Sequence, residues 1–265
     1  VYQYGASLPG IAKGVMSLGF IKGKMSEIIT EGAKKINYDF PNMLIEMKTF
    51  ETDIPLGFWR AVYDSQNAFA NECFIDELSY KGKVDPVELR LKHLDSNSRP
   101  AIVIKRAAKE SGWGKKIKAG HSQGFAYHHS FGSHVAEVAE VSISKSNKVK
   151  VHKITCVVDC GQTVNPMTIR AQMQGAIVYG LGATIKSEIT VKNGQIDQSN
   201  YDDYEVLRMN EMPHVDVHII KNNEEPGGVG EPGLPPIAPA VTNAVFAATG
   251  KRIRKLPITP KNLKT

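Results

Sequence analysis

The stretch that decides the fold is Val135-Ala-Glu-Val-Ala-Glu-Val-Ser-Ile143, followed by Val149-Lys-Val-His-Lys-Ile-Thr-Cys-Val-Val-Asp159. Both segments are rich in valine, and apolar residues alternate with polar ones, which is typical of β-strands. The polar connection between them contains Ser146-Asn147, a pair that favours a turn. The pattern therefore predicts a β-hairpin.

Helical periodicity surrounds this hairpin. Apolar residues recur at helical spacing from Ser65 onward, and Asp85-Pro86 can cap and start a second helix. Further helices are expected at 100–111, 167–180 and 237–249, and further strands at 42–49 and 215–219. Helices and strands mix without regular βαβ repetition, so we expect an α+β fold with mixed sheets and packed helices. A Lys/Gly-rich stretch suggests two units, at 1–115 and 116–265.

The composition is that of a globular protein. The 265 residues are 42% hydrophobic and 23% charged, and no apolar run reaches the roughly 20 residues of a membrane span. The net charge is +6, and the basic residues gather after Pro232, where no acidic residue follows. No groove-reading motif accompanies this basic tail, so we expect neither a nucleic-acid partner nor a transmembrane segment.

The cysteines and histidines do not form a metal site in the sequence pattern. Cys73 falls on the apolar face of a predicted helix and is expected in the core. Cys156 and Cys160 would lie about 13 Å apart along a strand, too far for a disulfide. His214 and His218 lie on a predicted strand, where they would not converge on one ion. We therefore predict no protein metal ligands and no four-cysteine iron–sulfur cluster in this chain.

The most unusual segment is Gly228-Val-Gly-Glu-Pro-Gly233, which fits the G-x-G-x-x-G pattern of dinucleotide-binding folds. The nearby prolines Pro232, Pro235 and Pro236 remove the backbone N–H groups that such a loop needs for a pyrophosphate. We therefore reject a dinucleotide site. The segment isolates Glu231 between glycine and proline, where it could act as a general base. From composition alone, an ordinary turn glutamate is the more frequent explanation.

Six motifs then occur in order along the chain. Together they resemble the C-terminal part of the molybdenum-binding large subunit of the xanthine oxidase/aldehyde oxidoreductase family, particularly the isoquinoline 1-oxidoreductase branch and its β-subunits. The resemblance covers nearly all of residues 36–257. The motifs are Gly57-Phe-Trp-Arg-Ala-Val-Tyr-Asp-Ser-Gln-Asn, Asp85-Pro-Val-Glu-Leu-Arg-Leu91, Ser130-Phe-Gly-Ser-His-Val-Ala-Glu-Val, Val158-Asp-Cys-Gly-Gln-Thr-Val-Asn-Pro166, Ala171-Gln-Met-Gln-Gly-Ala and Gly228-Val-Gly-Glu-Pro-Gly-Leu-Pro-Pro.

The resemblance implies a hydroxylase that oxidises an aldehyde or N-heteroaromatic substrate with oxygen from water. Its cofactor would be molybdenum-bearing molybdopterin, as the cytosine dinucleotide in bacteria. Glu231 would be the general base that deprotonates a hydroxyl group on molybdenum, and Gly230, which precedes it, would bind the cofactor. Trp59, Arg60 and Ala61 match the family's Phe-Arg-Gly motif beside the cofactor, and Gln172 matches a glutamine that binds the pterin.

The resemblance also concerns other parts of the site and of the assembly. The family's Gly-Gly-x-Phe-Gly and Gly-Gln-Gly loops have no counterpart here, since Ser122-Gln123-Gly124 is only a weak match. An upstream large-subunit chain would therefore supply the rest of the molybdenum site, and a small subunit would carry the [2Fe–2S] clusters. The two units would be the end of a first molybdopterin-binding subdomain and a second subdomain with the Gly-Glu-Pro-Gly loop.

Other interpretations stay open. Gln172 alone is also compatible with an ordinary helix-surface residue. The chain could be a non-catalytic interface chain of such a complex, or a metal-dependent hydrolase that uses Glu231. Members of this branch commonly carry a twin-arginine export signal, so the resemblance is compatible with a periplasmic and with a cytoplasmic location.

The segments 159–161 and 165–166 are expected to position the helix that follows them.

Overall fold

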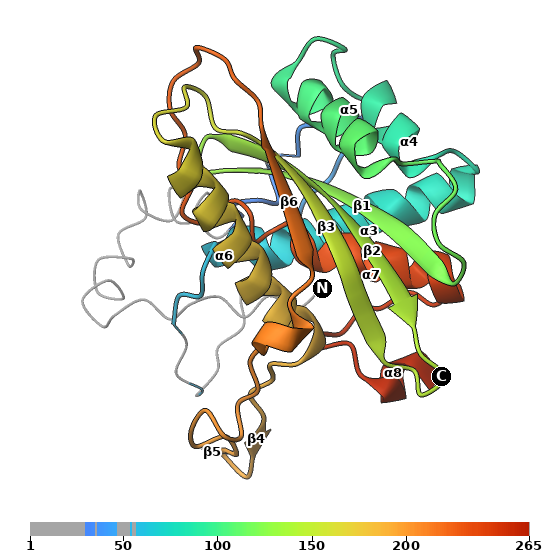
Figure 1. Cartoon of the computed structure of the whole chain (residues 1–265), viewed down its shortest axis with the longest axis vertical. Coiled ribbons are helices and arrows are strands. Elements are labelled where there is room, and N and C mark those ends of the chain that lie inside the picture. The colour runs from blue at the N-terminus through green and yellow to red at the C-terminus, as the bar shows by residue number, and fades with distance from the viewer. Residues whose placement is uncertain (1–29, 35, 47–53, 55–56, 265) are drawn as a thin grey trace.

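The structure is a computed structural model that describes residues 30–34, 36–46, 54 and 57–264. Its centre is a four-stranded sheet with helices on both faces (Figure 1). The mixture of helices with a mixed sheet confirms the predicted α+β class. Among the described residues, no helix has the length and apolar character needed to cross a membrane.

The sheet has the order β1-β2-β3-β6. Strands β1 (His121–Ser130), β2 (Ser133–Ile143) and β3 (Val149–Asp159) are antiparallel neighbours, and β6 (His214–Ile219) adds to β3 in parallel. The hairpin of the opening stretch is therefore confirmed, as is the strand near residue 215. A separate two-stranded hairpin consists of β4 (Val191–Lys192) and β5 (Gln195–Ile196).

The predicted helices are present, with the expected end signals. Asp85 Oδ1 accepts from the Val87 N–H at 2.8 Å and caps the second helix, and Gly250 ends the helix after Pro236 in a left-handed conformation. The elements are α3 (Val62–Gly82), α4 (Pro86–Lys92), α5 (Arg99–Ser111), α6 (Pro166–Ile185), η1 (Met209–Glu211), α7 (Ile237–Thr249) and α8 (Pro260–Lys264).

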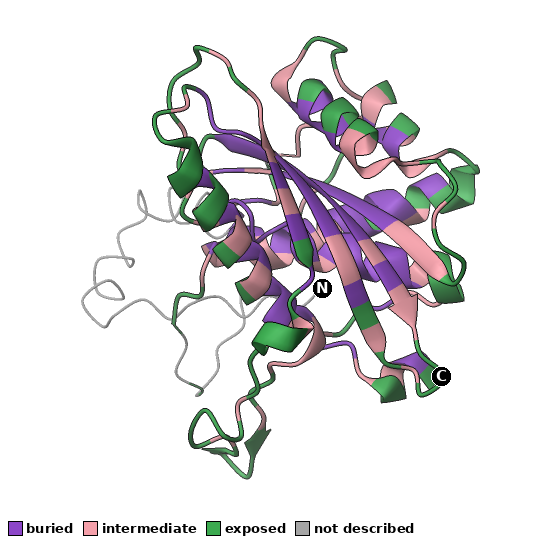
Figure 2. Ribbon diagram, viewed as in Figure 1, coloured by how far each residue is buried: buried purple, intermediate pink, exposed green. Residues whose placement is uncertain are grey.

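Two apolar layers hold the sheet between the helices. Helix α5 packs on β2 and β3 from one face, while α6 and α7 cover the other face. Figure 2 shows buried residues along most of the central strands, whereas the outer surface of α6 is exposed. At Gly124, an added Cβ would lie 2.1 Å from the Ala244 amide nitrogen, so this glycine lets α7 approach β1 closely. Gly124, the last residue of the weak Ser122-Gln123-Gly124 match, therefore has a packing role here.

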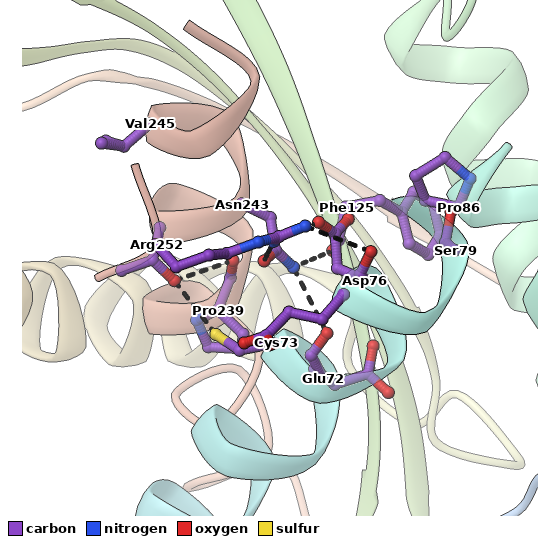
Figure 3. Close-up of polar contacts among 12 residues, drawn as sticks. Glu72, Cys73, Asp76, Ser79, Pro86, Phe125, Pro239, Asn243, Val245 and Arg252 are labelled. Carbon is purple, nitrogen blue, oxygen red and sulfur yellow. Dashed lines mark hydrogen bonds and ion pairs between the residues drawn. The ribbon is translucent and has the colours of Figure 1, made fainter. Parts of the chain in front are cut away.

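A buried polar cluster joins α3, β1 and α7 (Figure 3). Asn243 Nδ2 donates to the backbone carbonyl oxygens of Phe125, at 3.1 Å, and of Glu72, at 3.4 Å. Arg252 bonds the Asp76 carboxylate, and its guanidinium carbon lies 3.3 Å from the centre of the Phe246 ring. Polar contacts thus connect helix α3 to the sheet and to α7, and its sequence pattern does not predict them.

One predicted strand is wrong, and one observed strand was not predicted. Residues 42–46 form no strand, because this segment lies at the surface without a partner strand among the described residues, and 47–49 lie outside them. Strand β1 was not predicted, because the stretch that leads into it reads as a Lys/Gly-rich boundary. The division at residues 115 and 116 stays a prediction.

The three cysteines are free and buried, and Cys73 lies in the core as expected.

Candidate functional site

The site begins where the chain enters α3. Ala61 and Val62 both adopt left-handed backbone angles, with φ values of 69° and 46°. Such angles cost about 1–2 kcal/mol for a residue other than glycine. Hydrogen bonds from Val62 N–H to Trp59 C=O and from Asp64 N–H to Ala61 C=O, both at 2.9 Å, close the turn. The turn directs the Ala61 N–H away from the helix and toward the Glu231 side chain.

Glu231 meets this turn from the far end of the chain. Its Oε1 accepts from the Ala61 N–H at 2.8 Å, across 170 residues of sequence. The side chain is half-buried, and Pro232, Gly233 and Leu234 after it are buried. A Cβ on Gly233 would lie 3.1 Å from the Met173 sulfur, so the absence of a side chain lets the loop pass close to α6. The loop therefore holds the carboxylate in a fixed place.

Arg60 connects three segments of the site. Its Nε donates to the Gly230 carbonyl oxygen at 3.0 Å, and its Nη2 donates to Gln172 Oε1 at 3.2 Å on α6. Nη2 also contacts the Gly230 carbonyl. A planar guanidinium suits this bridge because its donors have fixed directions. The contact orients the Gln172 amide so that its NH2 group points away from the arginine.

Trp59 lies at the side of this group rather than inside it. Its ring stacks on Tyr179 of α6, with ring centres 5.1 Å apart and planes inclined by 29°. The indole is 36% exposed, and the tyrosine is 47% exposed. Trp59 also lines a mainly apolar cavity of about 310 Å³ between α3, α6 and the start of α7. Its other lining residues are Ser65, Gln66, Phe69, Gly180, Ala183, Thr184, Leu234, Ile237, Ala238 and Leu256.

The loop before Glu231 is fastened to the end of the sheet. Gly228 N–H donates to Phe131 C=O at 2.7 Å, and Gly227 N–H donates to Cys160 C=O at 2.9 Å. A Cβ on Gly227 would lie 2.6 Å from the Gly132 carbonyl oxygen, so only glycine fits this approach. The glycines of the loop therefore serve close backbone packing on the β1–β2 hairpin.

Asp159 organises the turn after β3. Arg99 donates to both of its carboxylate oxygens, at 2.8 and 2.9 Å, and Asn222 and the Gly161 N–H also donate to it. Burial raises the pKa of Asp159, but these hydrogen bonds outweigh burial and hold the pKa below its usual value. Asn165 caps α6 by accepting from Met167 N–H at 3.0 Å. Both segments thus precede and orient the helix that carries Gln172.

Five of the six predicted site residues form one set of contacts. Arg60, Ala61, Gln172, Gly230 and Glu231 come from three distant segments and are linked by the hydrogen bonds given above. Trp59 is attached to them through the chain and packs on Tyr179, which the sequence prediction missed. The spacing of seven residues between Gln172 and Tyr179 places both on the same side of α6 and could have indicated the tyrosine.

A buried contact between a histidine and an aspartate behind the turn was also missed. His128 Nε2 on β1 lies 2.6 Å from Asp64 Oδ1, in the first turn of α3, and both side chains are more than nine-tenths buried. Within the described parts of the chain, no group of three His, Cys, Asp or Glu side chains could hold a metal ion. The polar centre is thus one anchored carboxylate beside an arginine–glutamine pair, which can bind a polar planar group and accept a proton.

Comparison with known proteins identifies the family. The molybdopterin cofactor-binding domain family matches residues 72–213. The β-subunit of isoquinoline 1-oxidoreductase from Brevundimonas diminuta is 33% identical over 85% of this chain and 29% of its own length. A subunit of nicotinate dehydrogenase from Pseudomonas putida is 31% identical over 86% of this chain and 21% of its own length. The chain thus spans less than a third of these relatives.

A solved structure supports the fold. Aldehyde oxidoreductase from Desulfovibrio gigas superposes with a TM-score of 0.66 and 15% identity, over 79% of this chain and 41% of that protein. The resemblance to the molybdenum-binding subunits of the xanthine oxidase/aldehyde oxidoreductase family is therefore confirmed. The matched domain, the relatives and the shared fold together show that this chain belongs to the molybdopterin cofactor-binding domain family.

Proposed function

We propose that this chain forms part of a molybdenum hydroxylase that oxidises an aldehyde or an N-heteroaromatic compound with water as the oxygen source. The observation that carries the proposal is the Glu231 carboxylate, anchored by the Ala61 N–H at 2.8 Å beside the Arg60–Gln172 pair. The names of the relatives support the substrate class: isoquinoline and nicotinate are N-heteroaromatic, and another relative is an aldehyde dehydrogenase.

The residues present fit a pterin cofactor. The Gln172 Oε1 is held by Arg60, so the amide nitrogen at the other edge of the side chain is oriented to donate to a heterocyclic partner. Arg60 is half-buried and keeps further donors for an anionic group. Arg60, Gln172 and the Gly230 backbone would hold the cofactor. When bound, the molybdenum centre supplies the two-electron oxidation. The cytosine dinucleotide form is part of this proposal.

Glu231 would act as the general base. Its Oε1 is held by a backbone amide, which leaves Oε2 to accept a proton from the hydroxyl nucleophile. Pro232 and Gly233, which follow it, are buried, so this side of Glu231 faces protein rather than water. The loop fastened to the sheet keeps the carboxylate in position, which reduces the entropic cost of reaching a productive geometry.

The proposal includes partners, because this chain holds one side of the site. An upstream large-subunit chain would complete the molybdenum site, and a small subunit with [2Fe–2S] clusters would accept the electrons. The described cysteines are isolated and buried, so they give no cluster of their own. The isoquinoline and nicotinate relatives are each named as one subunit of their enzyme, which supports a multi-subunit protein.

The test is Glu231→Gln in the complete molybdenum enzyme. The amide keeps the size of the side chain but loses the basic oxygen, so turnover should fall at least about 100-fold while molybdenum content stays normal. Glu225→Gln is the matched control, because Glu225 is an exposed glutamate of the same loop. Normal turnover of the Glu231 variant would refute the base assignment and favour a non-catalytic interface chain.

Metal analysis of the purified enzyme separates the remaining alternative. A hydrolase would contain zinc or another hydrolytic metal and no molybdenum. The described residues offer no cluster of three metal-ligating side chains, so the geometry gives this alternative no support. Molybdenum with a pterin, in a ratio near one per chain, is the expected result.

A further inference from the structure

The geometry points to the His128–Asp64 pair as a positioning device that holds the Ala61 N–H in place for Glu231. This inference rests on the proposed function, since it concerns the same carboxylate. Asp64 lies in the first turn of α3, three residues after Ala61, and His128 lies on β1. The 2.6 Å contact between His128 Nε2 and Asp64 Oδ1 therefore joins the start of the helix to the sheet.

The turn needs such support because its backbone is strained. Ala61 and Val62 are consecutive left-handed residues, and Val62 is β-branched, which makes this conformation especially unfavourable. Strain of this kind persists only where surrounding contacts determine the conformation. The backbone hydrogen bonds of the turn are local, whereas the His128–Asp64 contact spans 64 residues and can resist a movement of the whole helix end.

The pair is well suited to a rigid role. The Asp64 and His128 side chains are 2% and 7% exposed, so water does not compete for their contact. Within the described part of the chain, Asp64 Oδ2 has no hydrogen-bond partner, so the carboxylate depends on the contact of Oδ1 with His128. Gly32 packs against this carboxylate so closely that a Cβ there would lie 2.7 Å from Asp64 Oδ1.

The contact between His128 and Asp64 acts on Glu231 through Ala61. Asp64 N–H donates to the Ala61 carbonyl, and the Ala61 N–H donates to Glu231 Oε1. If the helix start shifts, the Ala61 amide changes direction and the carboxylate loses its fixed orientation. Asp64 and His128 are thus positioning residues, since they bond each other and act on Glu231 only through the Ala61 backbone.

The test compares Asp64→Ala with Asp64→Asn in the assembled enzyme. The alanine variant loses the acceptor, and kcat should fall about 10- to 100-fold with KM changed less than about threefold. The asparagine Oδ1 can still accept from His128, so this variant should stay within about threefold of the parent. His128→Gln and His128→Ala make the same comparison from the strand, in case a variant at Asp64 fails to assemble.

Hydrogen–deuterium exchange follows the Ala61 amide directly and does not depend on turnover. In the Asp64→Ala protein, hydrogen–deuterium exchange of a peptide covering residues 59–64 should accelerate several-fold, with cofactor content unchanged. Adding Ala61→Gly to this variant removes the energetic cost of the left-handed conformation at residue 61. It should recover part of the lost kcat and slow part of the accelerated exchange. Unchanged exchange and kcat in Asp64→Ala, or equal losses in the asparagine variant, would overturn the inference. Normal turnover of Glu231→Gln with the exchange effect intact would instead refute the proposed function alone.

Discussion

Arg60 Nε donates to the carbonyl oxygen of Gly230 at 3.0 Å, and these two residues lie 170 positions apart in the chain. The same guanidinium donates to Gln172 on α6. One side chain therefore fixes the spacing between the start of α3, the Gly-Glu-Pro-Gly loop and α6. Together with the hydrogen bond between Ala61 and Glu231, this bridge holds the three segments in one site.

Arg60→Lys should disrupt the bridge without removing the positive charge. A lysine presents one ammonium group on a flexible stem and cannot hold Gly230 and Gln172 in fixed directions. Turnover should fall about 10- to 100-fold, because misplacement by about 1 Å is enough for such a loss. Steady-state kinetics and molybdenum content measure the effect. Arg170→Lys, at an exposed position of α6, is the control and should keep full turnover.

Gly124→Ala should weaken the packing of α7 on β1. The new Cβ would lie 2.1 Å from the Ala244 nitrogen and 2.2 Å from the Ala240 carbonyl oxygen, and backbone atoms cannot move aside as a side-chain end can. The loss in free energy of unfolding should reach about 3 kcal/mol. Gly182→Ala is the control, because its Cβ meets only Ser187 Oγ at an ordinary 3.6 Å. Equal melting temperatures for the two variants would contradict this packing argument.

Arg252→Ala should destabilise the protein through Asp76. The arginine bonds the Asp76 carboxylate and covers the Phe246 ring, so its removal leaves a buried carboxylate without its main partner. Burial raises the pKa of Asp76 while Arg252 lowers it, so the variant should retain a proton on Asp76 at higher pH. We expect a loss of about 3 kcal/mol in thermal or chemical unfolding.

The double variant Arg252→Ala with Asp76→Asn supplies the control for that prediction. Removing the unpaired charge should restore part of the lost stability, so the two effects should not add. Additive losses would show that the ion pair contributes little, and that Arg252 acts through its packing on Phe246 alone.

Glu137 should make stability fall as the pH rises. The residue is fully buried on β2, and neither carboxyl oxygen has a hydrogen-bond partner in the described structure. Burial raises the pKa of Glu137 well above its usual value near 4.5, and the opposing effect of the Cys156 thiol is smaller. The folded state therefore keeps a proton that the unfolded chain releases. Above pH 4.5, the free energy of unfolding should fall by up to about 1.4 kcal/mol per pH unit.

Glu137→Gln should remove this slope, because the amide does not ionise. Thermal unfolding of the assembled protein between about pH 5 and 8 measures it, and the comparison of slopes is independent of any constant cost of burying an amide. Glu140→Gln is the control, since Glu140 is partly exposed and bonded to His121. An unchanged slope in the Glu137 variant would mean that another group causes the pH dependence.

The sequence by itself determined the helices, the central hairpin and the family motifs. Periodicity located α3 and α7, and Asp85 and Gly250 marked helix ends because caps and left-handed stops depend on neighbouring residues only. The resemblance named Glu231 and Arg60 because the motif order is specific to the family. The strand expected at 42–49 was wrong in its described part, since alternation alone does not supply a partner strand.

Only the tertiary structure decided how these residues work together. The Ala61–Glu231 and Arg60–Gly230 contacts each span 170 residues, and no local pattern encodes a contact between such distant segments. The His128–Asp64 pair and the close approach at Gly124 likewise appear only when the sheet, α3 and α7 pack together. Local sequence sets the direction of each backbone segment, whereas packing sets the distances between segments, and the chemistry of this site depends on those distances.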